Sequence, residues 1–305
     1  MLPSTVAMPR GEYGYDAPYA LVIFGSLAVV SGLGAAIAWW RMPVHAAAPI
    51  SLYFVLFLAN TTSFFYTTRR GKFIEWERIL DRTQLRGDEI VLDMGCGRGA
   101  VLTAVARRLT TGRVTGVDIW STTDQSGNAK DLALRNASLE GVSDRVHIET
   151  ADMRALPFPD GSFDLVVSSL AIHNIRSNAD RKRAITEGFR VMKPEGRMVI
   201  ADIRATATYA DVLRTLGASN VEHHRLGWRF WWGNPLAATT LLTASKKKVL
   251  SLRHLSGAIY GRCSPEWQLF SNRVQLSVTH FCLSNYLLPN ILLAASAAAS
   301  SSTTG

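Results

Sequence analysis

Residues 89–99 combine an acid with closely spaced glycines and are the segment best suited to holding a charged ligand. An apolar stretch leads to Asp93, and glycines follow at alternate positions, Gly95, Gly97 and Gly99. Glycine lets the backbone turn tightly and approach a ligand without a Cβ in the way. The apolar spacing over 98–109 predicts a helix whose first N–H groups point into the turn. A strand, a glycine turn and a helix in this order predict a site for a nucleotide-containing cofactor.

Asp118 is the second acid with the spacing of a ligand-binding residue. It ends a second predicted strand at 114–118. It follows the last glycine by about 20 residues, the distance at which a βαβ unit places a carboxylate on a ribose diol. The alternative is an acid that only caps a turn. The alternating glycines differ from the spacing that seats a dinucleotide pyrophosphate, which argues against a dinucleotide.

Three later segments complete an ordered set of motifs: TADMRALPF at 150–158, FDLVVSS at 163–169 and MKPEGRMVI at 192–200. With the glycine segment, they resemble the class I S-adenosylmethionine-dependent methyltransferases, in particular the small-molecule branch that includes quinone and sterol enzymes. The resemblance covers about residues 78–245. It implies an α/β, Rossmann-like domain with a seven-stranded sheet, closed by an antiparallel pair of strands that we expect at 221–228 and 237–244.

The resemblance also implies that S-adenosylmethionine is the cofactor. The residues that would contact its methionine part lie at the glycine turn: Asp93, Gly95, Cys96 and Gly97. Those that would contact its nucleoside follow the next two strands: Asp118, Ile119, Asp152 and Met153. Those that would border the transferred methyl group end the fourth strand: Ser168 and Ser169. In these roles Asp93 pairs with the amino group, Asp118 with the ribose and Asp152 with the adenine. The placement agrees with ligand binding at the carboxyl ends of strands in open α/β sheets.

His173 is the candidate catalytic residue, because it lies just beyond the strand at 165–169, where an acceptor would enter. A sulfonium methyl group is already electrophilic, so positioning supplies most of the acceleration, and a base is needed only where the acceptor loses a proton. An imidazole suits that role near neutral pH. The alternative is a histidine that only makes a structural hydrogen bond.

Trp120 is either a wall of the ligand pocket or part of the core.

The N-terminal part of the chain contains two long stretches without ionised side chains, 17–40 and 44–66. Each is long enough to cross a hydrocarbon layer of about 30 Å as a helix. We therefore expect a transmembrane helical hairpin at 17–66, and the alternative is a buried hairpin of a soluble protein. Pro49 and Asn60 would be tolerated in the second helix if they faced the small residues of the first.

The charges that flank the hairpin predict its orientation. Arg69, Arg70 and Lys72 follow the second span and Arg10 precedes the first, whereas the turn holds Arg41 alone. Positively charged flanks stay on the cytosolic side. We therefore expect a multi-pass membrane protein with two spans, with both termini and the catalytic domain facing the cytosol.

The composition is compatible with one α/β core plus a membrane anchor. The chain has 305 residues, 48% of them hydrophobic, and a net charge of +9. This charge on a membrane-tethered domain favours an anionic bilayer surface over nucleic acid, for which no motif is present. The three cysteines, Cys96, Cys263 and Cys282, have neither disulfide-framework nor metal-site spacing. We expect no metal.

The predicted organisation has four parts: an N-terminal tail at 1–16, the hairpin at 17–66, a methyltransferase domain at 67–245 and an extension at 246–305. The extension is basic and then rich in Ala, Ser and Thr. Its uncharged segment 276–299 is either a third span or part of a poorly ordered extension. The leading functional hypothesis is a membrane-anchored enzyme that methylates a small-molecule or lipid acceptor. The alternative is a noncatalytic membrane protein that binds the cofactor and serves as an interaction module.

Overall fold

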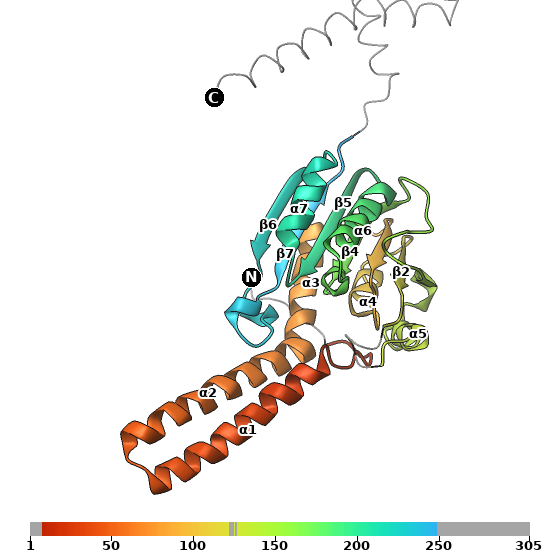
Figure 1. Cartoon of the computed structure of the whole chain (residues 1–305). Helices are drawn as coiled ribbons and strands as arrows, with labels where there is room; N and C mark the ends of the chain where they lie inside the picture. The colour runs from red at the N-terminus through yellow and green to blue at the C-terminus, as the bar shows by residue number, and fades with distance from the viewer. Residues whose placement is uncertain (1–7, 122–124, 126, 249–305) are drawn as a thin grey trace, which may run out of the picture. The chain divides into compact units, whose positions relative to one another are not determined.

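A computed structural model describes residues 8–121, 125 and 127–248 of the chain. It begins with two apolar helices, α1 (Pro18–Arg41) and α2 (Val44–Tyr66), which lie side by side (Figure 1). Both are long and apolar enough to cross a membrane. Many of their large apolar side chains are exposed, among them Val22, Val30, Leu33, Trp40 and Leu52. The extension beyond residue 248, with the segment 276–299, lies outside the described residues.

Small residues allow close packing of the two helices. The position of a Cβ on Gly32 would be 3.0 Å from the Phe54 ring, and on Gly34 it would be 3.6 Å from Ile50. Pro49 and Asn60 would be tolerated in α2 if they faced α1, but the structure gives them other surroundings. Pro49 is exposed, and Asn60 meets the loop between β6 and β7, where its Oδ1 accepts from Asn234 at 3.0 Å.

Seven strands form one sheet, as the sequence predicts, in the order β3-β2-β1-β4-β5-β7-β6. The strands are β1 (Ile90–Met94), β2 (Arg113–Asp118), β3 (Val146–Thr150), β4 (Phe163–Ser169), β5 (Met192–Asp202), β6 (Ser219–Arg225) and β7 (Thr240–Ser245). β7 is antiparallel to both of its neighbours, β5 and β6, and all other neighbouring pairs are parallel. Because β1 lies between β2 and β4, the strand order reverses there, and the carboxyl ends of β1 and β4 form the crevice where such sheets bind ligands.

Helices cover both faces of the sheet. The remaining helices are α3 (Lys72–Thr83), α4 (Ala100–Ala106), α5 (Lys130–Leu139), α6 (Asn178–Val191) and α7 (Thr206–Thr215). In β1, Val91 packs with α3 and α4 on one face, while Leu92 packs with α6 and α7 on the other. Successive side chains of a strand point to opposite faces. Continuous apolar strands such as β1 are therefore buried on both sides, as expected of a parallel sheet.

Two predicted elements differ from the observed ones. The helix expected at 98–109 is α4, which begins only after Gly99, a residue with φ of 83° at the N-cap. The final strand pair is displaced to 219–225 and 240–245, and residues 226–239 form what we call the β6–β7 loop. Gly227, Gly233 and Pro235 within this loop interrupt strand pairing.

Candidate active site

The glycine turn after β1 passes over the end of β2. The amide groups of Gly95 and Cys96 donate to the Val117 carbonyl at 2.8 and 3.1 Å. Gly95 has φ of 75°, and a Cβ there would lie 2.3 Å from the Ala171 Cβ. At Gly97, where φ is 52°, a Cβ would lie 2.6 Å from Gln125 Oε1. Both positions therefore require glycine for conformation and for space.

Asp93 is a fully buried carboxyl group without a partner. Only 1% of the residue is exposed, and neither carboxyl oxygen has a hydrogen-bond partner among the described residues. Burial, and then the charge of Asp118, raises its pKa to about 8. An unpaired polar group in this position costs free energy unless a ligand satisfies it. The cationic amino group expected of the cofactor fits this site.

Asp118 holds the glycine turn and the segment after β2. Its Oδ2 accepts from the Gly97 amide at 2.9 Å, and its Oδ1 accepts from the Trp120 amide at 2.7 Å. Asn128 also donates to Oδ1, at 3.2 Å, while its own buried Oδ1 has no partner among the described residues. Asn128, which the sequence analysis did not select, is therefore a further polar group available to a ligand beside Asp118.

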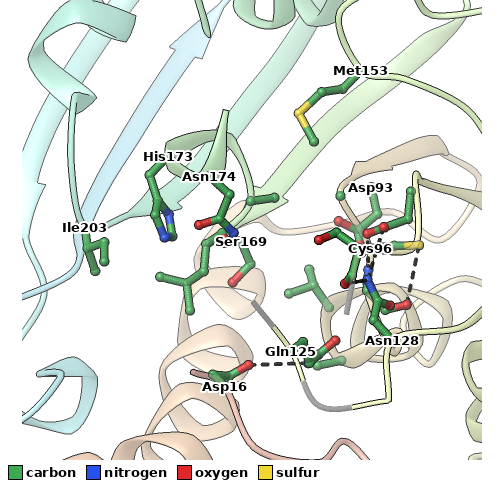
Figure 2. Close-up of a pocket in the computed structure, with 18 of the residues that line it drawn as sticks. Asp16, Asp93, Cys96, Gln125, Asn128, Met153, Ser169, His173, Asn174 and Ile203 are labelled. Atoms are coloured by element: carbon green, nitrogen blue, oxygen red, sulfur yellow. Dashed lines mark hydrogen bonds between the residues drawn. The ribbon is translucent and has the colours of Figure 1, made fainter. Parts of the chain in front are cut away.

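The segment before α1 closes one side of this region. Asp16 Oδ2 pairs with Lys72 at 2.5 Å, and Asp16 Oδ1 accepts from the Gln125 amide at 3.3 Å. Gln125 Oε1 in turn accepts from the Arg98 backbone at 3.0 Å. Figure 2 shows Asp16 and Gln125 together at the edge of the pocket. These contacts join three distant segments, and no local sequence signal predicts them.

One cavity of about 920 Å³ connects the glycine turn with the base of the hairpin. Its polar end contains Asp93, Asp118 and Asn128. What we call its apolar end has side chains from α1, α2, α3 and the β6–β7 loop: Tyr19, Ala20, Phe64, Phe73, Trp76 and Trp232. The paired Asp16 and Lys72 also line the cavity. In Figure 2, His173 and Ile203 lie on one side of the pocket, and Asp93, Cys96 and Asn128 lie on the other.

His173 lines this cavity and is paired with a buried carboxylate. Its Nδ1 lies 2.5 Å from Asp202 Oδ1, and its backbone amide donates to Asp202 Oδ2 at 3.1 Å. Asp202 is fully buried at the end of β5. A carboxylate on Nδ1 holds the proton there and leaves Nε2 as the basic nitrogen. The sequence predicts a strand at 198–202 but does not indicate a function for Asp202, its last residue. Asp202 comes close to His173 only because β5 lies next to β4 in the sheet.

Other predicted site residues also line the cavity: Gly95, Cys96, Gly97, Ile119, Asp152, Met153 and Ser169. Burial raises the pKa of the Cys96 thiol well above its usual range, and the nearby carboxylates Asp93 and Asp118 raise it further. Asp152 is held by Arg154, whose side chain donates to both carboxyl oxygens and keeps the pKa of Asp152 below its usual value.

Two residues that the sequence suggested for the site, Ser168 and Trp120, do not line the cavity. Ser168 is buried and its hydroxyl donates to the Met94 carbonyl at 2.7 Å, behind the surface that Ser169 provides. Trp120 has φ of 62° and its indole donates to Thr150 Oγ1 at 2.7 Å. Trp120 therefore packs beside the ends of β2 and β3 and does not form a pocket wall.

Comparisons with known proteins agree with this geometry. Residues 92–200 match the family described as "Methyltransferase domain". The chain contains a class I S-adenosylmethionine-dependent methyltransferase domain. This domain is 35% identical over 136 residues to the methyltransferase GfsG of Streptomyces halstedii, covering 45% of each chain. It is 33% identical over 129 residues to the ubiquinone/menaquinone biosynthesis C-methyltransferase UbiE of Enterobacter sp., covering 42% of this chain and 48% of that one.

A third relative is the 27-O-demethylrifamycin SV methyltransferase of Amycolatopsis mediterranei, 35% identical over 128 residues. The match covers 41% of this chain and 43% of that protein, so the similarity to each of these relatives spans less than half of its length. Among solved structures, the [4+2]-cyclase SpnF shares the fold of the methyltransferase domain, with a TM-score of 0.50 and 20% identity over 60% of this chain and 83% of that one.

Proposed function

We propose that this protein is a membrane-anchored methyltransferase that transfers the methyl group of S-adenosylmethionine to a small lipophilic acceptor. The observation that carries the proposal is a single cavity that joins an unpaired buried carboxyl group, Asp93, to the His173–Asp202 pair. The first suits a cationic cofactor, and the second suits an acceptor that must lose a proton.

The residues around the glycine turn bind and orient the cofactor. S-adenosylmethionine, when bound, supplies an electrophilic methyl group. Asp93 and the turn at Gly95 and Gly97 hold its methionine part, and Asp118 with Asn128 holds its ribose. Ile119, Asp152 and Met153 border its adenine, and Ser169 lies beside the reacting centre. Positioning the acceptor against the methyl group then supplies most of the acceleration.

His173 accepts the proton of the acceptor at Nε2. Asp202 keeps the other ring nitrogen protonated and stabilises the imidazolium that forms, because it is buried and within hydrogen-bond distance of Nδ1. The relatives include an enzyme that methylates oxygen and one that methylates carbon, according to their names. In both kinds of reaction the acceptor loses a proton, which supports a base in this position.

The lipophilic character of the acceptor is supported by the apolar end of the cavity. Tyr19, Ala20 and Phe64 belong to the hairpin, and they line the cavity together with Trp76 and Trp232. An acceptor that partitions into the bilayer would reach this end beside the base of the helices. A small water-soluble acceptor would gain little from these walls.

A labelling experiment tests the proposal. The purified full-length protein, with labelled S-adenosylmethionine, is incubated with a membrane-lipid extract or with the water-soluble metabolites of the same cells. Label should enter an organic-soluble product only with the lipid extract, and the His173→Ala variant should not form it. Label in a water-soluble product would refute the lipophilic acceptor. Cofactor binding without product in either extract would favour the noncatalytic alternative.

A further inference from the structure

The β6–β7 loop contains the most exposed large apolar side chain in the described part of the chain, Leu236, at 91% exposure. Trp228, at the start of the same loop, is 52% exposed. A single exposed apolar residue is common on soluble proteins and needs no explanation. What makes this loop different is its attachment to α2, because it contacts the part of the helix that would lie inside a membrane.

Several contacts fix the loop along the last two turns of α2. Asn234 donates to Asn60 Oδ1 at 3.0 Å, and a Cβ on Gly233 would lie 2.8 Å from the same oxygen. The Trp232 and Phe64 rings pack edge to face, with centroids 5.1 Å apart. Trp228 stacks on Tyr66 with centroids 5.2 Å apart. The loop therefore lies beside residues 60–66 of the helix.

Helix length places these contacts at a definite depth. The 23 residues of α2 rise about 1.5 Å each, so Asn60 lies about 24 Å along the axis from Val44. A hydrocarbon layer is about 30 Å thick. With Val44 at the far boundary, Asn60 would lie several ångströms inside the layer. Leu236, two residues beyond the partner of Asn60, lies at a similar level.

The backbone of the loop meets the main requirement for such a position. Polar backbone groups exposed to lipid must be satisfied within the protein. The Leu236 amide donates to the Asn234 side chain at 3.0 Å, and the Ala237 amide donates to the Asn234 carbonyl at 3.1 Å. The Trp232 amide donates to the Ala237 carbonyl at 3.0 Å, and Pro235 has no N–H to satisfy. Three N–H groups of the loop therefore bond within the loop itself, which lowers the cost of an apolar surrounding.

We propose that the β6–β7 loop is inserted into the cytosolic leaflet beside the hairpin, with Leu236 among the acyl chains and Trp228 at the headgroup level. The inference rests on the proposed membrane anchoring of α1 and α2. It explains why Asn60 is tolerated in an apolar span, since Asn234 is its partner. The Arg229 guanidinium, 4.6 Å from the Trp228 ring centroid, lies where cationic and aromatic residues meet lipid headgroups.

Insertion of the loop would give the catalytic domain a second attachment to the bilayer. The first attachment is the helix that runs without a break from α2 through residues 67–71 into α3, whose Trp76 and Leu80 pack in the core of the domain. The loop also supplies Trp232 to the apolar end of the cavity, where it meets Phe64 of the hairpin. The attachment therefore holds the apolar end of the cavity against the membrane, where a lipophilic acceptor would enter.

Spin-label accessibility in the full-length protein tests the inference without any turnover. Cys263 and Cys282 are replaced by serine, the buried Cys96 is kept, and one further cysteine is placed at Leu236, at Leu56 on the exposed surface of α2, or at Arg86 before β1. The background protein that has only Cys96 measures any label at that position. The proteins are labelled and reconstituted in vesicles of phosphatidylcholine and phosphatidylglycerol. Power saturation then compares collision with oxygen, which enriches in lipid, and with a water-soluble nickel chelate.

We expect the ratio of oxygen collisions to nickel-chelate collisions for the label at Leu236 to be close to the ratio at Leu56. It should be several-fold higher than the ratio at Arg86. A ratio at Leu236 equal to that at Arg86, with Leu56 in lipid, would overturn the loop insertion and leave the anchoring intact. A water-like ratio at Leu56 would overturn both. Neither result depends on methyl transfer, so a failure of the proposed activity is distinguished from a failure of this inference. Substitution at a position as exposed as Leu236 does not disturb the core.

Discussion

The proton on Asp93 connects the electrostatics of the site with cofactor binding. With a pKa of about 8, this carboxyl group is mostly neutral at pH 7 in the unliganded protein. Pairing with a cationic amino group requires the ionised form, so binding should release close to one proton at pH 7. Calorimetric titrations in buffers of different ionisation enthalpy measure this release. Asp93→Asn should bind more weakly and release none, and equal proton release by both proteins would refute the pairing.

The same group makes the stability of the unliganded protein depend on pH. The folded-state pKa of Asp93 lies above the value of about 3.9 expected for an unfolded chain. The free energy of unfolding is therefore highest, with respect to this group, below pH 4, where Asp93 is protonated in both states. It falls as the pH rises from 4 towards 8, because the unfolded chain ionises first. Melting curves should show that Asp93→Asn weakens this decline between pH 5 and 8. A wild-type decline that the substitution leaves unchanged would have to come from other groups.

The His173–Asp202 pair predicts a matched set of kinetic effects. His173→Ala should lower turnover by about 100-fold or more while leaving cofactor affinity unchanged, because it removes a general base. Asp202→Asn should reduce kcat more than it raises KM, since it alters the tautomer and not the shape of the site. The double variant should be little worse than either single one. His147→Ala, at an exposed position on β3, serves as the control.

If His173 only lines the pocket, its substitution should raise the KM of the acceptor and leave the pH profile of kcat unaltered. That outcome would remove the base and leave methyl transfer by proximity intact.

At the scale of single residues, the sequence predicted the acids at the polar end of the cavity but not the residues that hydrogen-bond to the predicted site residues. Asp93 and Asp118 could be chosen because each ends an apolar strand near the glycine turn, a pattern confined to a short stretch of chain. Asp202 and Asn128 could not, because their roles depend on which strands and loops become neighbours. Two residues that form a hydrogen bond but lie far apart in the chain leave no periodic pattern in the sequence, so their pairing cannot be predicted from it.

At the level of elements, the junction between the hairpin and the β6–β7 loop depends on Gly71. A Cβ at this position would lie 1.8 Å from the Arg229 carbonyl oxygen, so the loop would have to move. Gly71→Ala should destabilise the protein by about 1–3 kcal/mol, as overpacking of a close contact does. Thermal unfolding in a fixed detergent measures the change.

Gly25→Ala is the matched control for this substitution. The nearest atom to a Cβ at Gly25 is 4.0 Å away, in Thr61, and the residue lies within α1. Alanine is favoured over glycine in a helix interior, so this variant should be neutral or slightly more stable. A loss of stability at Gly25 equal to that at Gly71 would show that the junction has no special role.

Apolar periodicity predicted most of the regular elements, since the sheet buries both faces and its strands are continuously apolar. It failed where glycine and proline decide the course of the backbone. The two expected strands, 221–228 and 237–244, took in both ends of the β6–β7 loop, and only its middle was expected to connect them. Aromatic residues such as Trp228 favour strand structure, which is why the first strand was expected to extend so far. In the structure these rings pack on α2, and no pattern within the loop could show that partner.

The cavity is lined by segments that are far apart in the chain, from Pro9 near the N-terminus to Trp232 in the β6–β7 loop. Its walls come from the segment before α1, the base of the hairpin, the glycine turn and the end of β5. Tyr13 reaches across to α4, where its hydroxyl lies 2.8 Å from Thr103 Oγ1. Removing residues 8–16 should therefore open the cofactor region, although both helices of the hairpin would remain. The sequence does not predict these contacts, because residues 11–16 bond to segments distant in the chain, such as Asn136 in α5 and Lys72 in α3.

The proposed orientation of the hairpin in a membrane rests on the distribution of charge around it. Arg69 and Arg70 are exposed after α2, and Arg41 lies in the turn between the spans. Trypsin added to sealed vesicles with the cytosolic face outward should cleave after Arg69 or Arg70 and spare Arg41, which should be cut only after detergent is added. Carbonate washing should leave the hairpin in the membrane. Cleavage at Arg41 with protection of Arg69 would reverse the topology, and release of the whole chain by carbonate would refute the anchor.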